Sequence, residues 1–255
     1  MKERLFKNYH SYYKDGNTAD LKKREAYLDD DYGKLLPSDK NAVIIDVGCG
    51  MGHFLWYLQN KGYHNIKGID ICDEQLEWCK NNVCKNVEKV DDLLTFFLHS
   101  GAAFDLIIMN DLIEHLPKGE MVDILTGARK SLKPGGTLVC RLPNMSNIFG
   151  IYLLYNDFTH ETGFTENSLR QLLHLSGFND VVISGNKTRI NCLWKKPLFY
   201  LFSLISNKFI TLALKYIYMP GSKQPRIMNT FLIAAAREQE TCIYEKNTLY
   251  PSFSR

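Results

Sequence analysis

Three glycines at alternate positions follow a short apolar run in the stretch IIDVGCGMGHF, residues 44–54. Gly48, Gly50 and Gly52 lack a β-carbon, so the backbone can turn tightly here and a ligand can approach it closely. An acid, Asp46, lies two residues before the first glycine. The GxGxG spacing differs from the GxGxxG of dinucleotide sites, and no Gly-Lys-Ser or Gly-Lys-Thr follows, so neither of those nucleotide sites is predicted.

A second informative stretch is NDFTHETGFTENSL, residues 156–169, where Asp157 and His160 stand three residues apart. An imidazole with an ordinary pKa near 6.5 suits proton removal near neutral pH, so His160 is a candidate general base. Asp157 would fix the tautomer of this histidine or bind an acceptor hydroxyl. His115, in the sequence IEHL, is a rival base. Structural roles are the alternatives: His160 would then order its loop or cap a helix, and His115 would support the fold.

Alternating strand and helix patterns must position these residues. Apolar, β-branched runs predict strands at 42–47, 65–70, 86–90, 104–110, 137–143, 179–184 and 227–236. Helical periodicity predicts helices at 52–62, 73–83, 118–136 and 165–178, with Asp73 and Thr165 as N-caps and Gly177 as a stop. This alternation predicts a doubly wound α/β sheet, in which ligands bind beyond the carboxyl ends of the strands.

The domain organisation follows from shifts in composition. Residues 1–40 are polar and aromatic, which predicts a helical segment lying over the domain rather than a core element; Tyr9, His10, Tyr12 and Tyr13 would form a lid or pack this segment on the sheet. Residues 41–255 form one domain with a helical insertion at 185–226. Within the insertion, residues 193–219 carry one apolar helical stripe: Leu198, Leu201, Phe202, Ile205, Phe209, Leu212 and Tyr216.

Three interpretations of this stripe remain open. It packs on its own domain, forms a homodimer interface, or lies peripherally on a membrane surface. Packing or dimerisation is preferred, although Trp194 beside Lys195 and Lys196 would suit a lipid headgroup region. No run reaches the roughly 20 apolar residues that cross a bilayer.

Composition limits the remaining function classes. The net charge of +3 is too small to predict a nucleic-acid partner. The seven cysteines are odd in number and lack CxxC spacing, which predicts reduced, mostly buried thiols and a cytoplasmic protein. Asp111, Glu114 and Asp157 could hold Mg²⁺, but surface or structural acids are the preferred interpretation, so no metal site is predicted.

Five segments resemble, in order, those of class I S-adenosylmethionine-dependent methyltransferases. They are DVGCGMG (46–52), GIDI (68–71), VEKVDDLLTF (87–96), FDLIIMNDLIEHLP (104–117) and LKPGGTLV (132–139). The resemblance covers residues 40–142 and implies a Rossmann-like, seven-stranded mixed sheet whose last strand is antiparallel, with helices on both faces. It also implies that S-adenosylmethionine is the cofactor, contacted by Asp46, Gly48, Cys49, Gly50, Gly52, Asp70, Ile71, Asp91, Asp92, Asn110 and Asp111.

Individual roles follow from this resemblance. Asp46 would orient the loop and accept from the ammonium group of the cofactor, and Asp70 would accept from both ribose hydroxyls. Asp92 is expected at the adenine amino group, with Asp91 as the alternative register. Stretch 156–169 resembles methyltransferases of bacterial surface-polysaccharide clusters, in which a histidine faces the acceptor.

The expected activity is therefore O-methylation of a sugar hydroxyl, in a glycan or a nucleotide-sugar, during polysaccharide biosynthesis. His160, Asp157 and His115 are its candidate catalytic residues. Two alternatives stay open: O-methylation of a lipophilic phenol or quinone, and a non-catalytic methyltransferase fold that binds a partner. If the 193–219 helix meets a membrane, the protein would lie peripherally on the inner membrane.

Overall fold

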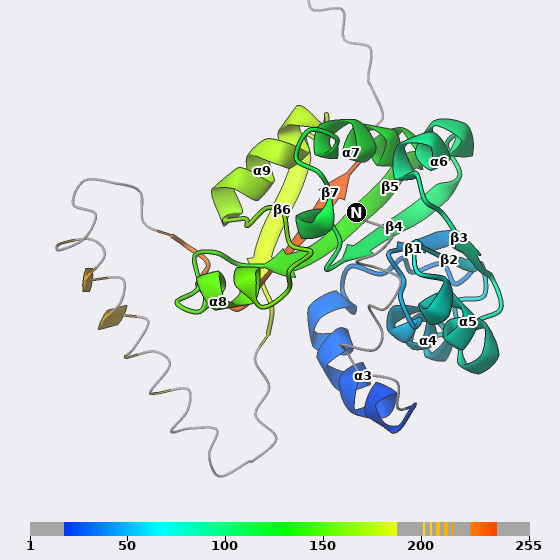
Figure 1. Cartoon of the computed structure of the whole chain (residues 1–255), viewed down its shortest axis with the longest axis horizontal. Helices are drawn as coiled ribbons and strands as arrows, with labels where there is room; N and C mark the ends of the chain where they lie inside the picture. The colour runs from blue at the N-terminus through cyan, green and yellow to red at the C-terminus, as the bar shows by residue number, and fades with distance from the viewer. Residues whose placement is uncertain are drawn as a thin grey trace, which may run out of the picture.

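The computed structural model describes residues 18–187 and 225–238, together with seven single positions between 201 and 216. Its centre is one seven-stranded sheet with the strand order β3-β2-β1-β4-β5-β7-β6 (Figure 1). The strands are β1 (Ile44–Val47), β2 (Ile66–Asp70), β3 (Val87–Lys89), β4 (Phe104–Asn110), β5 (Leu132–Pro143), β6 (Asp180–Gly185) and β7 (Phe231–Arg237). The first five are parallel, and β7 pairs antiparallel with both β5 and β6. The predicted mixed sheet is confirmed.

The central strands are buried on both faces, because helices cover both sides of the sheet. Ile44 and Leu106 belong to one hydrophobic cluster, whereas the next residues along each strand, Ile45 and Ile107, belong to the other. The first cluster lies against α3 (Thr18–Tyr32), α4 (His53–Asn60) and α5 (Asp73–Asn82). The second lies against α6 (Leu93–Ser100), α7 (Met121–Lys130) and α9 (Glu166–Leu175). Figure 1 shows these two helical layers on opposite sides of the sheet.

Local capping chemistry is confirmed at α9 and corrected at α5. The Thr165 side chain accepts from the Ser168 N–H, and the Ser168 hydroxyl accepts from the Thr165 N–H, which makes a complete capping box. Gly177 ends this segment with φ +89°. Asp73, by contrast, is not the N-cap of α5. Cys72 holds that position, and Asp73 is already the first helical residue.

Several boundaries differ from the sequence-based expectations. The helix predicted for 118–136 ends at Lys130, because Leu132 already pairs with Phe104 as the first residue of β5. Helix α6, helix α8 (Gly150–Tyr155) and the 3₁₀ turn η1 (Ile113–His115) were not predicted. Each is short or lacks a clear apolar period, so the pattern in the sequence is weak.

The N-terminal helix α3 packs more deeply than its polar sequence predicted. Its last residue, Tyr32, is fully buried in the core and contacts the ring of Phe54 at a centroid distance of 4.9 Å. The Asp29 carboxylate accepts from Tyr57 Oη at 2.9 Å and pairs with Lys61 at 2.7 Å. The end of this segment is therefore a core element, whereas Tyr9, His10, Tyr12 and Tyr13 lie outside the described residues.

The apolar stripe of the insertion is exposed where the structure describes it. Leu201, Ile205, Phe209, Leu212 and Tyr216 each expose more than half of their surface. Packing on its own domain, a preferred interpretation, is therefore wrong for these five side chains; Leu198 and Phe202 lie outside the described residues. Within the described part of the chain, no helix is long and apolar enough to cross a membrane.

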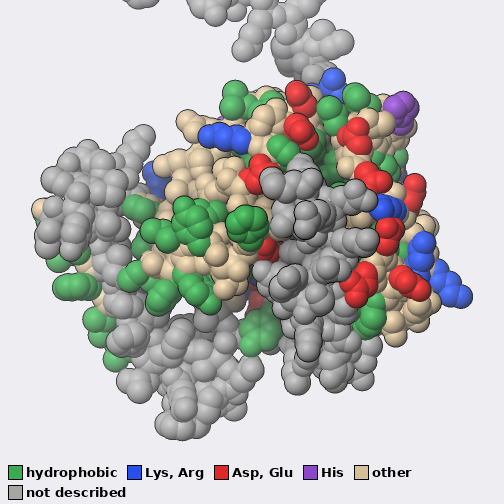
Figure 2. Space-filling model, viewed as in Figure 1, with side chains coloured by type: hydrophobic (Ala, Val, Ile, Leu, Met, Phe, Trp, Pro, Cys, Tyr) green, Lys and Arg blue, Asp and Glu red, His purple; other side chains and the backbone are tan. Residues whose placement is uncertain are grey.

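Apolar side chains also gather over α8, as Figure 2 shows. The exposed side chains in and beside this helix are Ile148, Phe149, Ile151, Tyr152, Tyr155 and Phe158. The side chains of five described cysteines are buried, as predicted: Cys49, Cys72, Cys79, Cys84 and Cys140.

The glycine loop follows β1 in a left-handed backbone conformation. The φ angles of Gly48, Gly50 and Gly52 are +73°, +50° and +78°. A β-carbon at Gly52 would also collide with Cys79 Sγ and lie 3.3 Å from Val83 Cγ1 on the neighbouring helix segment. The third glycine is therefore required by packing between the loop and α5 as well as by backbone conformation.

We expect Gly52→Ala to lower the free energy of unfolding by about 2–5 kcal/mol, the sum of left-handed strain and steric overlap. Gly62→Ala is the matched control, because its φ is +83° and nothing lies within 4 Å of an added β-carbon. Strain alone should cost this variant about 1–2 kcal/mol. Urea unfolding monitored by circular dichroism measures both values. Equal losses would show that contact with Cys79 does not constrain the loop.

Candidate active site

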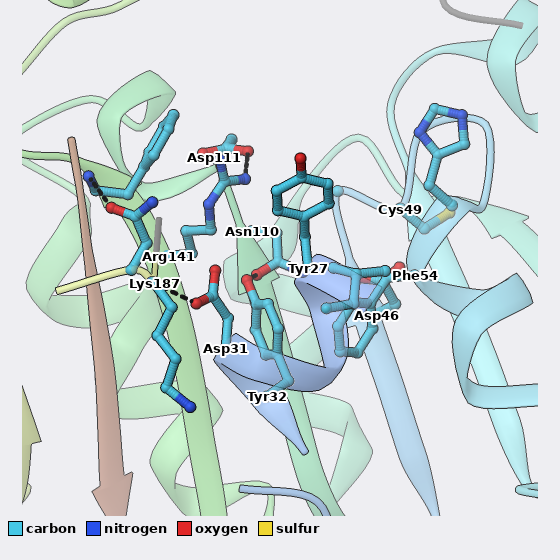
Figure 3. A pocket seen from close by; sticks show the side chains of 15 residues that line it. Tyr27, Asp31, Tyr32, Asp46, Cys49, Phe54, Asn110, Asp111, Arg141 and Lys187 are labelled. Atoms are coloured by element: carbon cyan, nitrogen blue, oxygen red, sulfur yellow. Dashed lines mark hydrogen bonds and ion pairs between the residues drawn. The ribbon is translucent and has the colours of Figure 1, made fainter. Parts of the chain in front are cut away.

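Two adjoining cavities lie where β1 and β4 end, at the point where the strand order reverses. Their volumes are about 520 and 620 Å³. Both are lined by Gly48, Cys49, His53, Asn110 and Asp111, so they form one continuous cleft along the glycine loop and the end of β4. Figure 3 shows the smaller cavity, which is bounded by α3 and the ends of β4 and β5.

Asp70, the last residue of β2, holds the glycine loop through its carboxylate. Oδ2 accepts from the Gly50 N–H at 2.8 Å, and Oδ1 accepts from the Cys72 N–H at 2.8 Å. Burial raises the pKa of Asp70, although these N–H donors act in the opposite direction. A carboxylate has about four lone-pair positions, so Asp70 keeps acceptor capacity for a ligand in the larger cavity.

Asp46, in β1, is a buried carboxylate on the wall of the smaller cavity, with 2% of its surface exposed. Among the described residues, no donor pairs with it. Burial, and then the charge of Asp70, raise the pKa of Asp46 to about 7. A buried carboxylate needs a partner to remain charged, so this position favours a cationic group in the cavity.

The two adjacent acids after β3 have different surroundings. Asp92 caps α6: Oδ1 accepts from the Thr95 N–H at 3.0 Å, and Oδ2 accepts from the Thr95 hydroxyl at 2.6 Å. These bonds lower the pKa of Asp92. Asp91 makes an exposed ion pair with Lys89 at 3.8 Å. Both acids line the larger cavity, and the Asp92 carboxylate, like that of Asp70, keeps lone-pair positions beyond its two hydrogen bonds.

The smaller cavity contains polar residues that the sequence did not single out. Tyr32 Oη donates to Asn110 Oδ1 at 2.6 Å, and Arg141 pairs with Asp111 at 2.6 Å while lying 3.8 Å from the ring centroid of Phe231 (Figure 3). Asp111 has a φ of +49°, a conformation that Asp tolerates better than most residues. No local motif marks Tyr32 or Arg141, because both reach the site only through the packing of distant elements.

Asp31 faces the same cavity from α3. Its Oδ1 accepts from the backbone N–H of Lys187 at 2.7 Å, which joins α3 to the end of β6 (Figure 3). Burial raises the pKa of Asp31. The wall of this cavity therefore combines carboxylates, an amide and a guanidinium with aromatic rings.

His115, at the end of η1, lines the larger cavity and is held by a short polar chain. Its Nδ1 lies 2.8 Å from Thr159 Oγ1, and the Thr159 hydroxyl lies 2.6 Å from Asp157 Oδ1. Because a carboxylate only accepts, Thr159 donates to Asp157 and accepts from His115 Nδ1–H. The lone pair of His115 is therefore on Nε2. Burial, and then the neighbouring His160, lower the pKa of His115, which favours the neutral imidazole.

His160 is held in the same tautomer by a different element. Its Nδ1 lies 3.1 Å from the carbonyl oxygen of Leu153 and 3.0 Å from that of Leu154. Carbonyl oxygens only accept, so Nδ1 carries the proton and Nε2 the lone pair. His160 therefore binds the last turn of α8, the helix before it, while its ring lies 4.6 Å from that of His115 between centroids.

Glu114 completes this group. Only 2% of its surface is exposed, and neither carboxylate oxygen has a hydrogen-bond partner among the described residues. Burial, and then the charge of Asp111, raise the pKa of Glu114 well above its ordinary value. Its backbone oxygen accepts from the Glu161 N–H at 2.8 Å, which fixes the loop carrying His160 beside η1.

Most of the predicted residues meet at this cleft. The larger cavity is lined by Gly48, Cys49, Gly50, Asp70, Ile71, Asp91, Asp92, Asn110, Asp111 and His115, and the smaller one also by Asp46. Gly52 lines neither cavity, because it faces α5. His160 and Asp157 also line neither, and they reach the cleft only through their contacts with His115 and Thr159.

Known proteins share this fold and parts of this sequence. A solved S-adenosylmethionine-dependent methyltransferase from Archaeoglobus fulgidus superposes with a TM-score of 0.61 at 19% identity, covering 90% of this chain and 97% of the other. Phosphoethanolamine N-methyltransferase of Plasmodium falciparum is 31% identical over 104 residues, which are 40% of this chain and 39% of that protein. The 27-O-demethylrifamycin SV methyltransferase of Amycolatopsis mediterranei is 26% identical over 138 residues, covering 51% and 49%.

The chain thus spans less than half the length of these two relatives. The sequence profile of the methyltransferase domain family matches residues 21–183, which is more than half of the chain. The resemblance to class I methyltransferases is therefore confirmed, and the protein belongs to the family of S-adenosylmethionine-dependent methyltransferases.

Proposed function

We propose that this protein methylates a hydroxyl group of a small polar acceptor, a sugar in a glycan or a nucleotide-sugar. The observation that carries this proposal is the chain His115–Thr159–Asp157, which holds a neutral histidine on the wall of the cofactor cleft. A hydroxyl must lose its proton as it attacks, so O-methylation is the reaction that uses such a group.

The residues of the cleft fit S-adenosylmethionine. When bound, this cofactor supplies a methyl group already activated on a sulfonium. Asp46, on the wall of the smaller cavity, would pair with its ammonium group, and Asp70 would accept from the ribose hydroxyls while holding Gly50. Asp92 would accept from the adenine amino group, with Asp91 as the alternative, because both acids line the larger cavity and keep lone pairs for a ligand.

The composition of the smaller cavity supports a sugar acceptor. Planar polar groups such as those of Asp31, Asn110 and Arg141 can each bind adjacent hydroxyls, and Phe231 offers an apolar face. A phenol or quinone would be expected in a more apolar pocket. The link to surface polysaccharides rests on the resemblance of residues 156–169 alone.

Methyl transfer forms a bond between the acceptor oxygen and the methyl carbon and breaks the bond from that carbon to sulfur. The residues of this chain contribute by binding both reactants in line, which is an effect of proximity and orientation. The acceptor proton leaves toward the histidine group, where His115 lines the cleft and His160 and Asp157 position it.

The exposed stripe at 201–216 stays a predicted contact with a partner subunit or a membrane surface.

An acceptor panel tests the substrate class. The full chain is incubated with methyl-¹³C-labelled cofactor and, separately, nucleotide-sugars, oligosaccharides, catechol and phosphoethanolamine, and the labelled methyl group is located by NMR. We expect an O-methyl signal on a sugar. Transfer to catechol alone, or an N-methyl signal on phosphoethanolamine alone, would contradict the proposal.

His115→Ala should reduce turnover by about 10²–10⁴-fold, because it removes the group that receives the acceptor proton. The dissociation constant for S-adenosylhomocysteine should change far less. His99→Ala is the control, because His99 is exposed on α6 and contacts only the Thr95 carbonyl oxygen among the described residues. Full turnover by His115→Ala would place proton removal elsewhere.

A further inference from the structure

Glu114, His115 and His160 form a compact group of possible metal ligands. One donor atom from each residue lies within 4.8 Å of the donor atoms of the other two. They come from two separate segments, η1 and the loop after α8, which the hydrogen bonds from Glu161 and Thr162 to the Glu114 carbonyl oxygen hold together. The group is therefore fixed by the fold and is not a chance meeting of long surface side chains.

Both histidines are oriented as metal ligands usually are. A ligating histidine donates its other ring N–H to a backbone carbonyl, a carboxylate or a similar acceptor, which fixes the tautomer and the direction of the lone pair. His160 donates from Nδ1 to the carbonyl oxygens of Leu153 and Leu154, and His115 donates from Nδ1 to Thr159, which is in turn bonded to Asp157. Each histidine thus presents the lone pair of Nε2.

Glu114 supplies an independent indication of a ligand. Its side chain is almost fully buried, and in the part of the chain that the structure describes both oxygens lack a hydrogen-bond partner. A buried carboxylate without a partner is costly, by several kcal/mol in proteins, whereas a bound cation would compensate its charge. No described cationic side chain takes this place, since Arg141 pairs with Asp111.

We propose that Glu114, His115 and His160 bind a divalent transition-metal ion of the Zn²⁺ class. Two imidazoles and one carboxylate suit such ions, whereas Mg²⁺ prefers oxygen ligands. The all-oxygen set of Asp111, Glu114 and Asp157 is not available, because Asp111 is held by Arg141 and Asp157 by Thr159. Ligand atoms around one tetrahedral ion lie about 3.3 Å apart, so the group closes slightly on binding.

The metal site deepens the proposed function. The role given to the ion, activation of the acceptor hydroxyl, rests on that proposed function. Three protein ligands leave a coordination position open, as in catalytic zinc sites. An acceptor hydroxyl bound there would lose its proton to solvent near neutral pH, because the ion lowers the pKa of a coordinated oxygen. With the ion bound, His115 would hold the ion instead of receiving the acceptor proton itself, and Thr159 and Asp157 would be positioning residues.

The test uses the metal alone. The full chain is treated with a chelator, the chelator is removed, and Zn²⁺ is titrated by calorimetry, with Co²⁺ absorption spectra to detect nitrogen ligands. We expect one Zn²⁺ per chain with a micromolar or lower dissociation constant. Glu114→Gln and His160→Asn should weaken it at least 30-fold, whereas the matched controls Glu161→Gln and His174→Asn should leave it unchanged.

The outcomes separate the two proposals. Absence of stoichiometric binding, or full affinity in both Glu114→Gln and His160→Asn, would overturn the metal site. Undiminished sugar methylation by the chelated protein would overturn the role of the ion in the reaction. Should either variant fail to fold, the Co²⁺ spectrum of the unsubstituted chain decides, because a spectrum without nitrogen ligands contradicts the site. Zn²⁺ binding at these residues without methylation of any hydroxyl acceptor would instead contradict only the proposed function.

Discussion

The carboxylate of Asp46 is buried and that of Asp70 is half-buried, near the ends of the neighbouring strands β1 and β2 and beside the glycine loop. Asp70 is stabilised by two backbone N–H groups, one of which belongs to the loop itself. Asp46 has no donor among the described residues, and its pKa is raised to about 7. Like charges that are close and poorly solvated cannot both ionise easily. The cleft therefore favours binding of a positive group beside Asp46, while Asp70 holds the backbone of the glycine loop.

The other elements of the site depend on this arrangement. The glycine loop can donate the Gly50 N–H to Asp70 only because its glycines adopt positive φ angles. The loop packs against α5 only because Gly52 carries no side chain. On the opposite side of the cleft, η1 and the loop after α8 bring three ionisable side chains together at the end of β4. One end of the cleft thus suits the cofactor, and the neighbouring walls suit an acceptor and its proton.

Sequence patterns predicted those features that local physics decides. The strands, the N-cap at Thr165, the glycine loop and the acids at its edges depend on a few consecutive residues, and all are present in the structure. The cap of α5 was placed one residue late, because Asp is a preferred N-cap residue, whereas the actual cap, Cys72, makes no side-chain cap hydrogen bond that its residue type could indicate. The predicted helix at 118–136 was too long, because strand pairing of Leu132 overrides the helical pattern.

Features that depend on distant contacts could not be predicted. Tyr32 and Arg141 enter the site because α3 and β5 pack beside β4, and neither stands in a motif. The histidines were identified as candidates, but their shared tautomer and their contact with Glu114 depend on Thr159, on α8 and on η1. The exposure of Leu201, Ile205, Phe209, Leu212 and Tyr216 could not be predicted from the helical spacing of these apolar residues. A helix that packs on its own domain and a helix that binds a partner have the same apolar spacing.

The most direct test of this account measures the proton released when S-adenosylhomocysteine binds. Calorimetry in buffers of different ionisation enthalpy gives that number, and Asp46→Asn is the control, because proton uptake by the ligand itself cancels in the difference. Asp46, with a pKa of about 7, is about half protonated at pH 7 before binding. A bound ammonium group lowers this pKa, so the unsubstituted chain should release about half a proton more than Asp46→Asn, and its affinity should rise with pH through 7. Equal proton release by both proteins would contradict the role of Asp46 as partner of the cofactor.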